Sequence, residues 1–155
     1  MSLQEGDAAP SVSAENQHGD LVEPAFSEPT VVYFYPKDDT PGCSIEANQF
    51  QAELETYHEA GVEVYGVSLD DVDSHRAFAD GEDLAFDLLA DPDGDVAAAF
   101  DVELREIQGH TVTNRTTFVL ADGEVAAVYE GVDPDGHARE VLQDVLDDGL
   151  ATLPE

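Results

Sequence analysis

The sequence predicts an α/β fold in which a central mixed sheet is flanked by helices. Three observations support this prediction. A continuous β-branched and aromatic run at residues 31–35 is typical of a buried central strand. A helical pattern and a second apolar run follow it, and the order strand, helix, strand implies a right-handed parallel crossover. Later in the chain, Asp122-Gly123 lies between two apolar runs, which is typical of an antiparallel hairpin.

The first half of the chain is expected to contain a small hairpin, the central strand and a long helix. The hairpin is expected around residues 18–20, whose His-Gly-Asp sequence suits a turn. The helix is expected at residues 41–60, where Thr40 suits the N-cap position and Pro41 the first helical position. Gly61 is expected to end this helix.

Seven further elements are expected after this helix. They are a strand at 62–67, a helix at 71–80, a strand at 86–89, a helical turn or two at 96–100, paired strands at 116–120 and 124–129, and a helix at 136–148. The whole order describes a thioredoxin-like fold with an insertion and an N-terminal extension. At 155 residues, the chain is expected to form a single domain spanning residues 1–155.

The charge of the chain is extreme. It contains 36 Asp and Glu against 5 Lys and Arg, which gives a net charge of −31, and the acids are spread along its length. Such a charge repels nucleic acid and anionic membranes, so neither is an expected partner. A hydrophobic fraction of 42% argues against disorder. We interpret the composition as adaptation to a salty cytoplasm.

A calcium-binding loop at residues 91–95 is the alternative explanation for part of this acidity. It fits poorly, because Pro92 lies inside the loop and Val102 stands where a terminal Glu is needed. No cofactor or metal is expected elsewhere either. The five histidines show no metal-ligand spacing and are expected on helix surfaces or in loops: His18, His58, His75, His110 and His137.

The location is expected to be the cytoplasm. No stretch reaches the roughly 18 apolar residues that span a bilayer. The first residues include neither a basic segment nor a hydrophobic one, as a signal peptide would. A single cysteine permits no internal disulfide.

That single cysteine, Cys43, falls where the long helix is expected to begin. Backbone N–H groups at a helix N-terminus carry partial positive charge, which favours the thiolate, the reactive form of cysteine. Most free cysteines are instead small buried hydrophobes. The residues that surround Cys43 favour the reactive role.

The pattern P-x-x-x-T-x-x-C contains Pro36, Thr40 and Cys43 at its three fixed positions. This pattern and five further segments follow, in order, those of one known protein subfamily. The five segments are residues 6–10, 66–68, 74–78, 86–94 and 115–118. Over nearly its whole length the chain therefore resembles peroxiredoxins of the bacterioferritin comigratory protein or peroxiredoxin Q type. This resemblance implies a peroxiredoxin-type insertion in the thioredoxin-like fold.

The resemblance also implies thiol-dependent reduction of hydrogen peroxide and organic hydroperoxides. Cys43 would attack the peroxide as a thiolate and become a sulfenic acid. Thr40 would hold the peroxide, and Pro36 would shield the thiolate. Arg115 would supply a cation that Glu46 helps to position. Each has a simpler alternative: an N-cap for Thr40, a strand terminator for Pro36, a surface salt bridge for Arg115 and a solvated side chain for Glu46.

The chain departs from the subfamily at Asn48, where many members have a second, resolving cysteine. We therefore expect a one-cysteine peroxiredoxin that depends on an external thiol, which could be thioredoxin, glutaredoxin or a small thiol. The alternatives are a redox sensor or relay that passes oxidation to a partner protein, and a non-catalytic interaction module. The resemblance permits a monomer or a dimer.

We expect low salt to loosen or unfold the chain. Like charges repel across a Debye length of roughly 30 Å at 0.01 M salt, and this length falls to about 3 Å near 1 M. Circular dichroism and the melting temperature, followed from dilute buffer to molar KCl, test this expectation. A melting temperature that stays constant over that range would refute the interpretation as salt adaptation.

Overall fold

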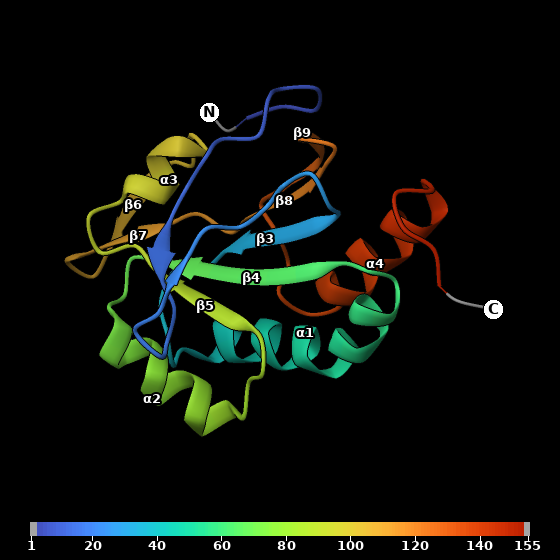
Figure 1. Cartoon of the computed structure of the whole chain (residues 1–155). Helices are drawn as coiled ribbons and strands as arrows, with labels where there is room; N and C mark the ends of the chain where they lie inside the picture. Colours follow the sequence, from blue (N-terminus) through green and yellow to red (C-terminus); the bar gives the residue numbers. More distant parts are fainter. Residues whose placement is uncertain (1–2, 154–155) are drawn as a thin grey trace.

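A five-stranded mixed sheet forms the centre of the fold (Figure 1). The computed structural model describes residues 3–153, so the two ends of the predicted 1–155 domain lie outside the described residues. The strand order is β5-β4-β3-β8-β9. The central strand β3 (Thr30–Phe34) pairs in parallel with β4 (Glu63–Ser68) and antiparallel with β8 (Thr116–Ala121).

The outer strands complete the predicted topology. β5 (Asp87–Ala90) lies parallel to β4, and β9 (Glu124–Glu130) lies antiparallel to β8. The β8–β9 hairpin turns at Asp122-Gly123, where both residues have positive φ angles of 55° and 76°. These values suit the primed turns that join twisted strands, as the Asp-Gly sequence predicts. The α/β thioredoxin-like fold with a mixed sheet is therefore confirmed.

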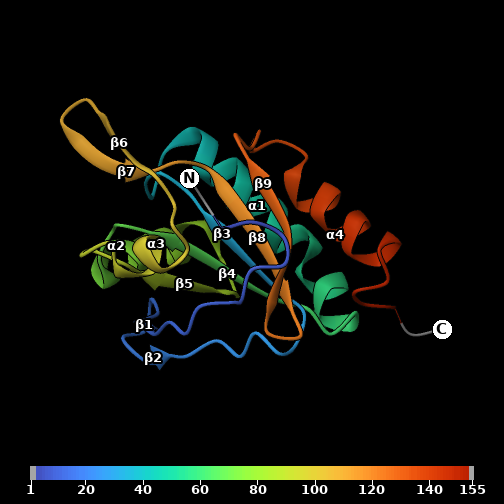
Figure 2. The same cartoon turned by 90° about the horizontal axis from the view of Figure 1, so that it is seen from above.

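Helices cover both faces of this sheet. α1 (Pro41–Glu59), α2 (Val72–Glu82) and α4 (His137–Asp147) pack on one face, and α3 (Asp95–Ala99) packs on the other together with the N-terminal segment (Figures 1 and 2). Side chains of a strand alternate between the two faces. Val31 and Tyr33 of β3 therefore join one core, whereas Val32 and Phe34 join the other. All of β3 is buried, which explains its uninterrupted apolar sequence.

The predicted elements are confirmed with small shifts of their ends. The N-terminal hairpin is present as β1 (Ala14–Glu15) and β2 (Leu21–Val22). Gly61 follows α1 with a φ of 79°, a backbone conformation that favours glycine at a helix end. Asp71 caps α2 by accepting a hydrogen bond of 2.9 Å from the Ser74 amide.

The sequence pattern predicts no element at residues 104–113, where the structure has a hairpin. It consists of β6 (Leu104–Ile107) and β7 (His110–Thr113), and it projects from the body of the molecule (Figure 2). All of β6 is exposed, so no buried apolar run marks it. The available signal is Gln108-Gly109, whose φ angles of 51° and 82° suit a two-residue turn.

A buried polar network fixes the loop that joins β3 to α1. The Asp38 carboxylate, in that loop, accepts hydrogen bonds from the Tyr35 hydroxyl at 2.6 Å and from the Ser74 hydroxyl at 2.8 Å. His75 Nδ1 lies 2.7 Å from Asp38 Oδ2, and His75 Nε2 lies 3.0 Å from the Leu89 carbonyl. A carbonyl oxygen only accepts, so Nε2 is the donor to Leu89, and the 2.7 Å contact ties Nδ1 to the Asp38 carboxylate. The network ties the loop to α2 and β5.

Two of the five histidines are not where the sequence analysis predicts them. His75 is 0% exposed and His137 is 3% exposed, so a surface or loop position is wrong for both. Both ring nitrogens of each histidine lie near a partner, which reduces the cost of burying a polar ring. His18, His58 and His110 are exposed as expected.

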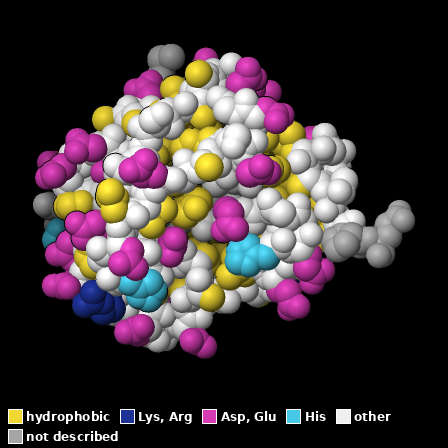
Figure 3. All heavy atoms as spheres, viewed as in Figure 1, with side chains coloured by type: hydrophobic (Ala, Val, Ile, Leu, Met, Phe, Trp, Pro, Cys, Tyr) yellow, Lys and Arg dark blue, Asp and Glu magenta, His cyan; other side chains and the backbone are white. Residues whose placement is uncertain are grey.

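Acidic side chains are scattered over the face of the molecule seen in Figure 3 and do not gather in one patch. The acids seen on this face are therefore dispersed, as the spacing of acids along the sequence indicates. Among residues 3–153, no helix combines the length and apolar character required to cross a membrane.

Replacing His75 with Leu should destabilise the fold strongly. The substitution leaves the buried Asp38 without its imidazole partner, and breaking a buried pair in this way costs about 3 to 5 kcal/mol. Urea unfolding at constant high salt measures the loss. His58→Leu, at an exposed position of α1, is the matched control and should change the free energy of unfolding by less than about 0.5 kcal/mol. Equal effects of the two substitutions would contradict a structural role for the network.

Candidate active site

Cys43 lies in the first turn of α1, as the sequence register predicts. Thr40 occupies the N-cap position, Pro41 the first helical position, and the Ser44 amide donates to the Thr40 carbonyl at 2.8 Å. The cysteine is 1% exposed and packs in the core between α1 and the sheet. A thiol in this place is close to the unpaired amides of a helix start and is shielded from bulk water.

Thr40 is at the predicted N-cap position but does not cap the helix with its side chain. Its hydroxyl instead donates to the Lys37 carbonyl at 2.9 Å, back into the loop. The predicted N-cap position is therefore confirmed, and the hydroxyl makes its hydrogen bond outside the helix. Because the hydroxyl proton is used in the loop, the lone pairs of the oxygen remain able to accept a hydrogen bond.

Arg115 contacts the cysteine sulfur directly. Its Nη2 donates to Cys43 Sγ at 3.2 Å. The sheet register explains this contact across 72 residues of sequence, because Thr116 of β8 pairs with Phe34 of β3. Arg115, one residue before β8, therefore lies at the end of β3 from which the chain runs into α1.

Glu46 accepts a hydrogen bond from the same guanidinium, with Arg115 Nη1 lying 3.0 Å from Glu46 Oε1. The Glu46 side chain is 1% exposed, so the alternative of a solvated glutamate is wrong. Its other oxygen, Oε2, has no hydrogen-bond partner among residues 3–153. Removal from water raises the pKa of Glu46 to about 7, and the nearby Arg115 cation opposes that rise.

The simpler alternative for Arg115, a salt bridge at the surface, is wrong. Arg115 does pair with an acid, Glu46, but the pair is largely buried. Its side chain is 17% exposed, and its acidic partner is buried. One cation thus lies between a thiol and a carboxyl in a place largely removed from solvent. Electrostatic interactions are stronger in such a place than at the surface.

Pro36 and Thr40 lie in the loop that precedes Cys43. Pro36 is half-buried and follows Tyr35, whose amide donates to the Val67 carbonyl at 3.1 Å. The Tyr35 carbonyl accepts from the Thr113 hydroxyl at 2.9 Å. These hydrogen bonds continue the sheet as far as Tyr35, so Pro36 is the first residue beyond the regular strand pairing.

A second loop, residues 131–136 between β9 and α4, also lies against the site, and the sequence analysis does not identify it. The Val132 amide donates to the Arg115 carbonyl at 3.3 Å. The Gln49 side chain holds the loop on α1, donating to Asp135 Oδ1 at 2.7 Å and accepting from the Gly136 amide at 2.6 Å. Neither Gln49 nor the loop belongs to a recognisable sequence motif.

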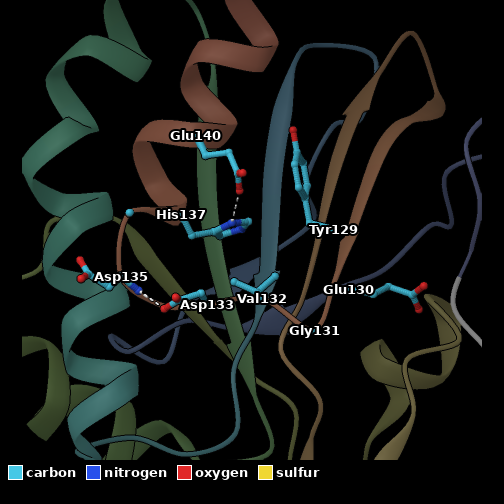
Figure 4. Close-up of a pocket in the computed structure, with 9 residues that line it drawn as sticks. Tyr129, Glu130, Gly131, Val132, Asp133, Asp135, His137 and Glu140 are labelled. Carbon is cyan, nitrogen blue, oxygen red and sulfur yellow. Dashed lines mark hydrogen bonds and ion pairs between the residues drawn. The ribbon is translucent and has the colours of Figure 1, made fainter.

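This loop forms one wall of a pocket of about 500 Å³ beside the site (Figure 4). Residues from β9, the loop and the start of α4 line it: Tyr129, Glu130, Gly131, Val132, Asp133, Asp135, Gly136, His137 and Glu140. Cys43 is not among them. The pocket is open, and four of its nine lining residues are acidic, so we assign the chemistry to the sulfur and its cation instead. Within the described part of the chain, no group of three or more potential ligands is arranged to hold a metal ion.

The model of the AhpC/TSA family matches residues 5–128 of this chain. The chain belongs to this family, as a peroxiredoxin of the Bcp and peroxiredoxin Q type. It is therefore a thiol peroxidase.

Relatives that match over most of their length support this assignment. The peroxiredoxin Bcp of Bacillus subtilis is 33% identical over 153 residues, covering 95% of this chain and 98% of the relative. The crystal structure of peroxidoxin BcpB from Mycobacterium tuberculosis is similar with a TM-score of 0.85 and 31% identity, over 94% of this chain and 97% of that one. The bacterioferritin comigratory protein of Xanthomonas campestris gives a TM-score of 0.80 and 34% identity, over 90% and 92%.

Replacing Glu46 with Gln in this peroxiredoxin should change how its stability depends on pH. A carboxyl whose pKa is raised by folding stabilises the folded state fully below its ordinary pKa of 4.5, and this contribution is lost as pH rises through about 7. The stability of the wild type relative to Glu46→Gln should therefore decrease by on the order of 3 kcal/mol from the lower to the higher pH.

Urea unfolding of the reduced protein at a series of pH values measures this difference. Glu55→Gln, at an exposed position of the same helix, is the control. A difference between wild type and Glu46→Gln that does not change with pH, or changes no more than that of the control, would contradict a raised pKa for Glu46.

Proposed function

We propose that this peroxiredoxin reduces hydrogen peroxide and organic hydroperoxides by a one-cysteine mechanism that an external thiol completes. The observation that carries the proposal is the 3.2 Å contact between Arg115 Nη2 and the sulfur of Cys43, the only cysteine in the chain. A cation beside a thiol favours the thiolate, which is the nucleophile that attacks peroxides.

In the first step, the Cys43 thiolate attacks the terminal oxygen of the peroxide. An S–O bond forms and the O–O bond breaks, so sulfur is oxidised to a sulfenic acid and the peroxide is reduced to hydroxide or alkoxide. That anion takes up a proton and leaves as water or an alcohol. Arg115 stabilises the negative charge as it moves from sulfur to oxygen, because its Nη2 group lies beside the reacting sulfur of Cys43.

The neighbouring side chains have supporting roles in this proposal. The Thr40 oxygen, whose proton is donated to the Lys37 carbonyl, accepts a hydrogen bond from the peroxide. Pro36 shields the sulfur from water and offers no N–H to compete for it. Glu46 positions Arg115 through the 3.0 Å bond to Nη1.

In the second step, an external thiol attacks the sulfenic sulfur and releases water, forming a mixed disulfide that a second thiol reduces. The chain cannot form an internal disulfide, because Cys43 is its only cysteine and Asn48 stands where many members of the subfamily have a resolving cysteine. The Asn48 side chain donates to Glu82 at 2.9 Å. Thioredoxin, glutaredoxin and small thiols are the candidate reductants.

Two observations support the substrate class and the setting. The Xanthomonas campestris relative is described as having alkyl peroxide reduction activity, which supports organic hydroperoxides as substrates here. The acidic composition supports a salty cytoplasm as the place of action.

Stopped-flow mixing of the reduced protein with hydrogen peroxide in molar KCl tests the proposal. One equivalent of peroxide should be consumed rapidly, and intact mass spectrometry should show the gain of one oxygen atom. Cys43→Ser, which keeps the size of the side chain, should consume none and retain the fold by circular dichroism.

Consumption no faster than that of a free thiol would overturn the proposal in favour of an interaction module. Once oxidation is established, steady turnover with a small thiol or thioredoxin supports a peroxidase. A mixed disulfide that accumulates with one partner protein and does not turn over would instead assign the sensor or relay function.

A further inference from the structure

Gly42 lies directly before the reactive cysteine, at the second position of α1. A Cβ atom built on Gly42 would lie 2.7 Å from Arg115 Nη2 and 3.6 Å from Arg115 Cζ. Contacts of a Cβ below 3.0 Å essentially never occur in proteins. A side chain of any kind at this position would therefore require the end of Arg115 to move.

The nitrogen that would be displaced is the one that donates to Cys43 Sγ at 3.2 Å. The other nitrogen, Nη1, is held by the buried Glu46 carboxyl at 3.0 Å. Pro134 Cγ lies 3.6 Å from the same Cβ position, at an ordinary contact distance. A methyl group would thus fit against Pro134 and meet only the guanidinium at too short a distance.

Backbone geometry does not explain a glycine at this position. Among residues 3–153, nine glycines have positive φ angles, and Gly42 is not one of them. Alanine could adopt its backbone conformation and is a better helix former than glycine. What disfavours a side chain at Gly42 in this structure is the space that Arg115 occupies.

We infer that Gly42 is a positioning residue for peroxide reduction, because its missing side chain provides the space through which Arg115 reaches the sulfur. This inference rests on the role proposed above for Arg115. It concerns placement of the cation, since Gly42 itself has no group that contacts the peroxide.

Gly42→Ala should therefore fold normally and react slowly. The displaced atom is the far end of a flexible side chain, so the melting temperature should be unchanged or higher. An ordinary carbon–nitrogen contact requires Nη2 to retreat by somewhat less than 1 Å, and misplacements of this size cost up to about 100-fold in rate. We expect the second-order rate constant for hydrogen peroxide to fall by roughly 10- to 100-fold.

A double-mutant cycle tests whether the effect passes through Arg115. Arg115→Ala alone should lower the rate on the order of 100-fold or more. Adding Gly42→Ala to Arg115→Ala should lower it no further than about twofold, because the group that the methyl displaces is gone. Gly81→Ala in α2, where a Cβ meets nothing within 4 Å, is the matched control and should react like the wild type.

Two results would overturn the inference: an unchanged rate in Gly42→Ala, or the same loss in the Arg115→Ala background as in the wild type. The rate at which iodoacetamide alkylates Cys43 at a fixed pH gives a readout that does not depend on peroxide. Gly42→Ala should change this rate in the same direction as Arg115→Ala does. A wild type that reacts slowly with peroxide would reject the proposed function. The alkylation rates would still decide whether Gly42 places Arg115 beside the sulfur.

Discussion

The guanidinium of Arg115 is the group around which the site is organised. It donates hydrogen bonds to two acidic side chains, Cys43 and Glu46, in a place that is shielded from bulk water. It lies 3.2 Å from Cys43 Sγ and 3.0 Å from Glu46 Oε1. Cys43 and Glu46 are three residues apart on α1, so they lie on one face of the helix and can share one cation. A buried carboxyl without a partner is strongly unfavourable, so the same contact serves both stability and chemistry.

Three separate segments must meet to hold that cation in place. The register of β8 against β3 brings Arg115 to the end of the central strand. The loop before α1 is tied to α2 and β5 through Asp38 and His75. The loop at residues 131–136 is attached to α1 through both ends of the Gln49 amide. The reactive sulfur is therefore positioned by contacts from both halves of the chain.

Local features of the sequence predict much of this arrangement. The apolar run of β3, the helix start before Cys43 and the Asp-Gly turn each depend on neighbouring residues. Only the family pattern predicts Arg115 as a site residue, since nothing local joins it to a cysteine 72 residues away. The burial of Glu46 and the pairing of His75 with Asp38, 37 residues apart, depend on tertiary contacts that no single-sequence pattern contains. The β6 strand has no apolar run because none of its side chains is buried in a core.

The scattered surface acids affect the two reactants of a peroxidase differently. Hydrogen peroxide is uncharged, so the field of a chain with a net charge of −31 neither attracts it nor repels it. An anionic thiol or an acidic partner protein must approach against that field, whereas a cationic one is drawn in. Dissolved ions shorten the range of the field and lower this barrier. While the chain stays folded, ionic strength therefore changes how fast a charged reductant reaches the oxidised protein and does not change how fast uncharged peroxide arrives.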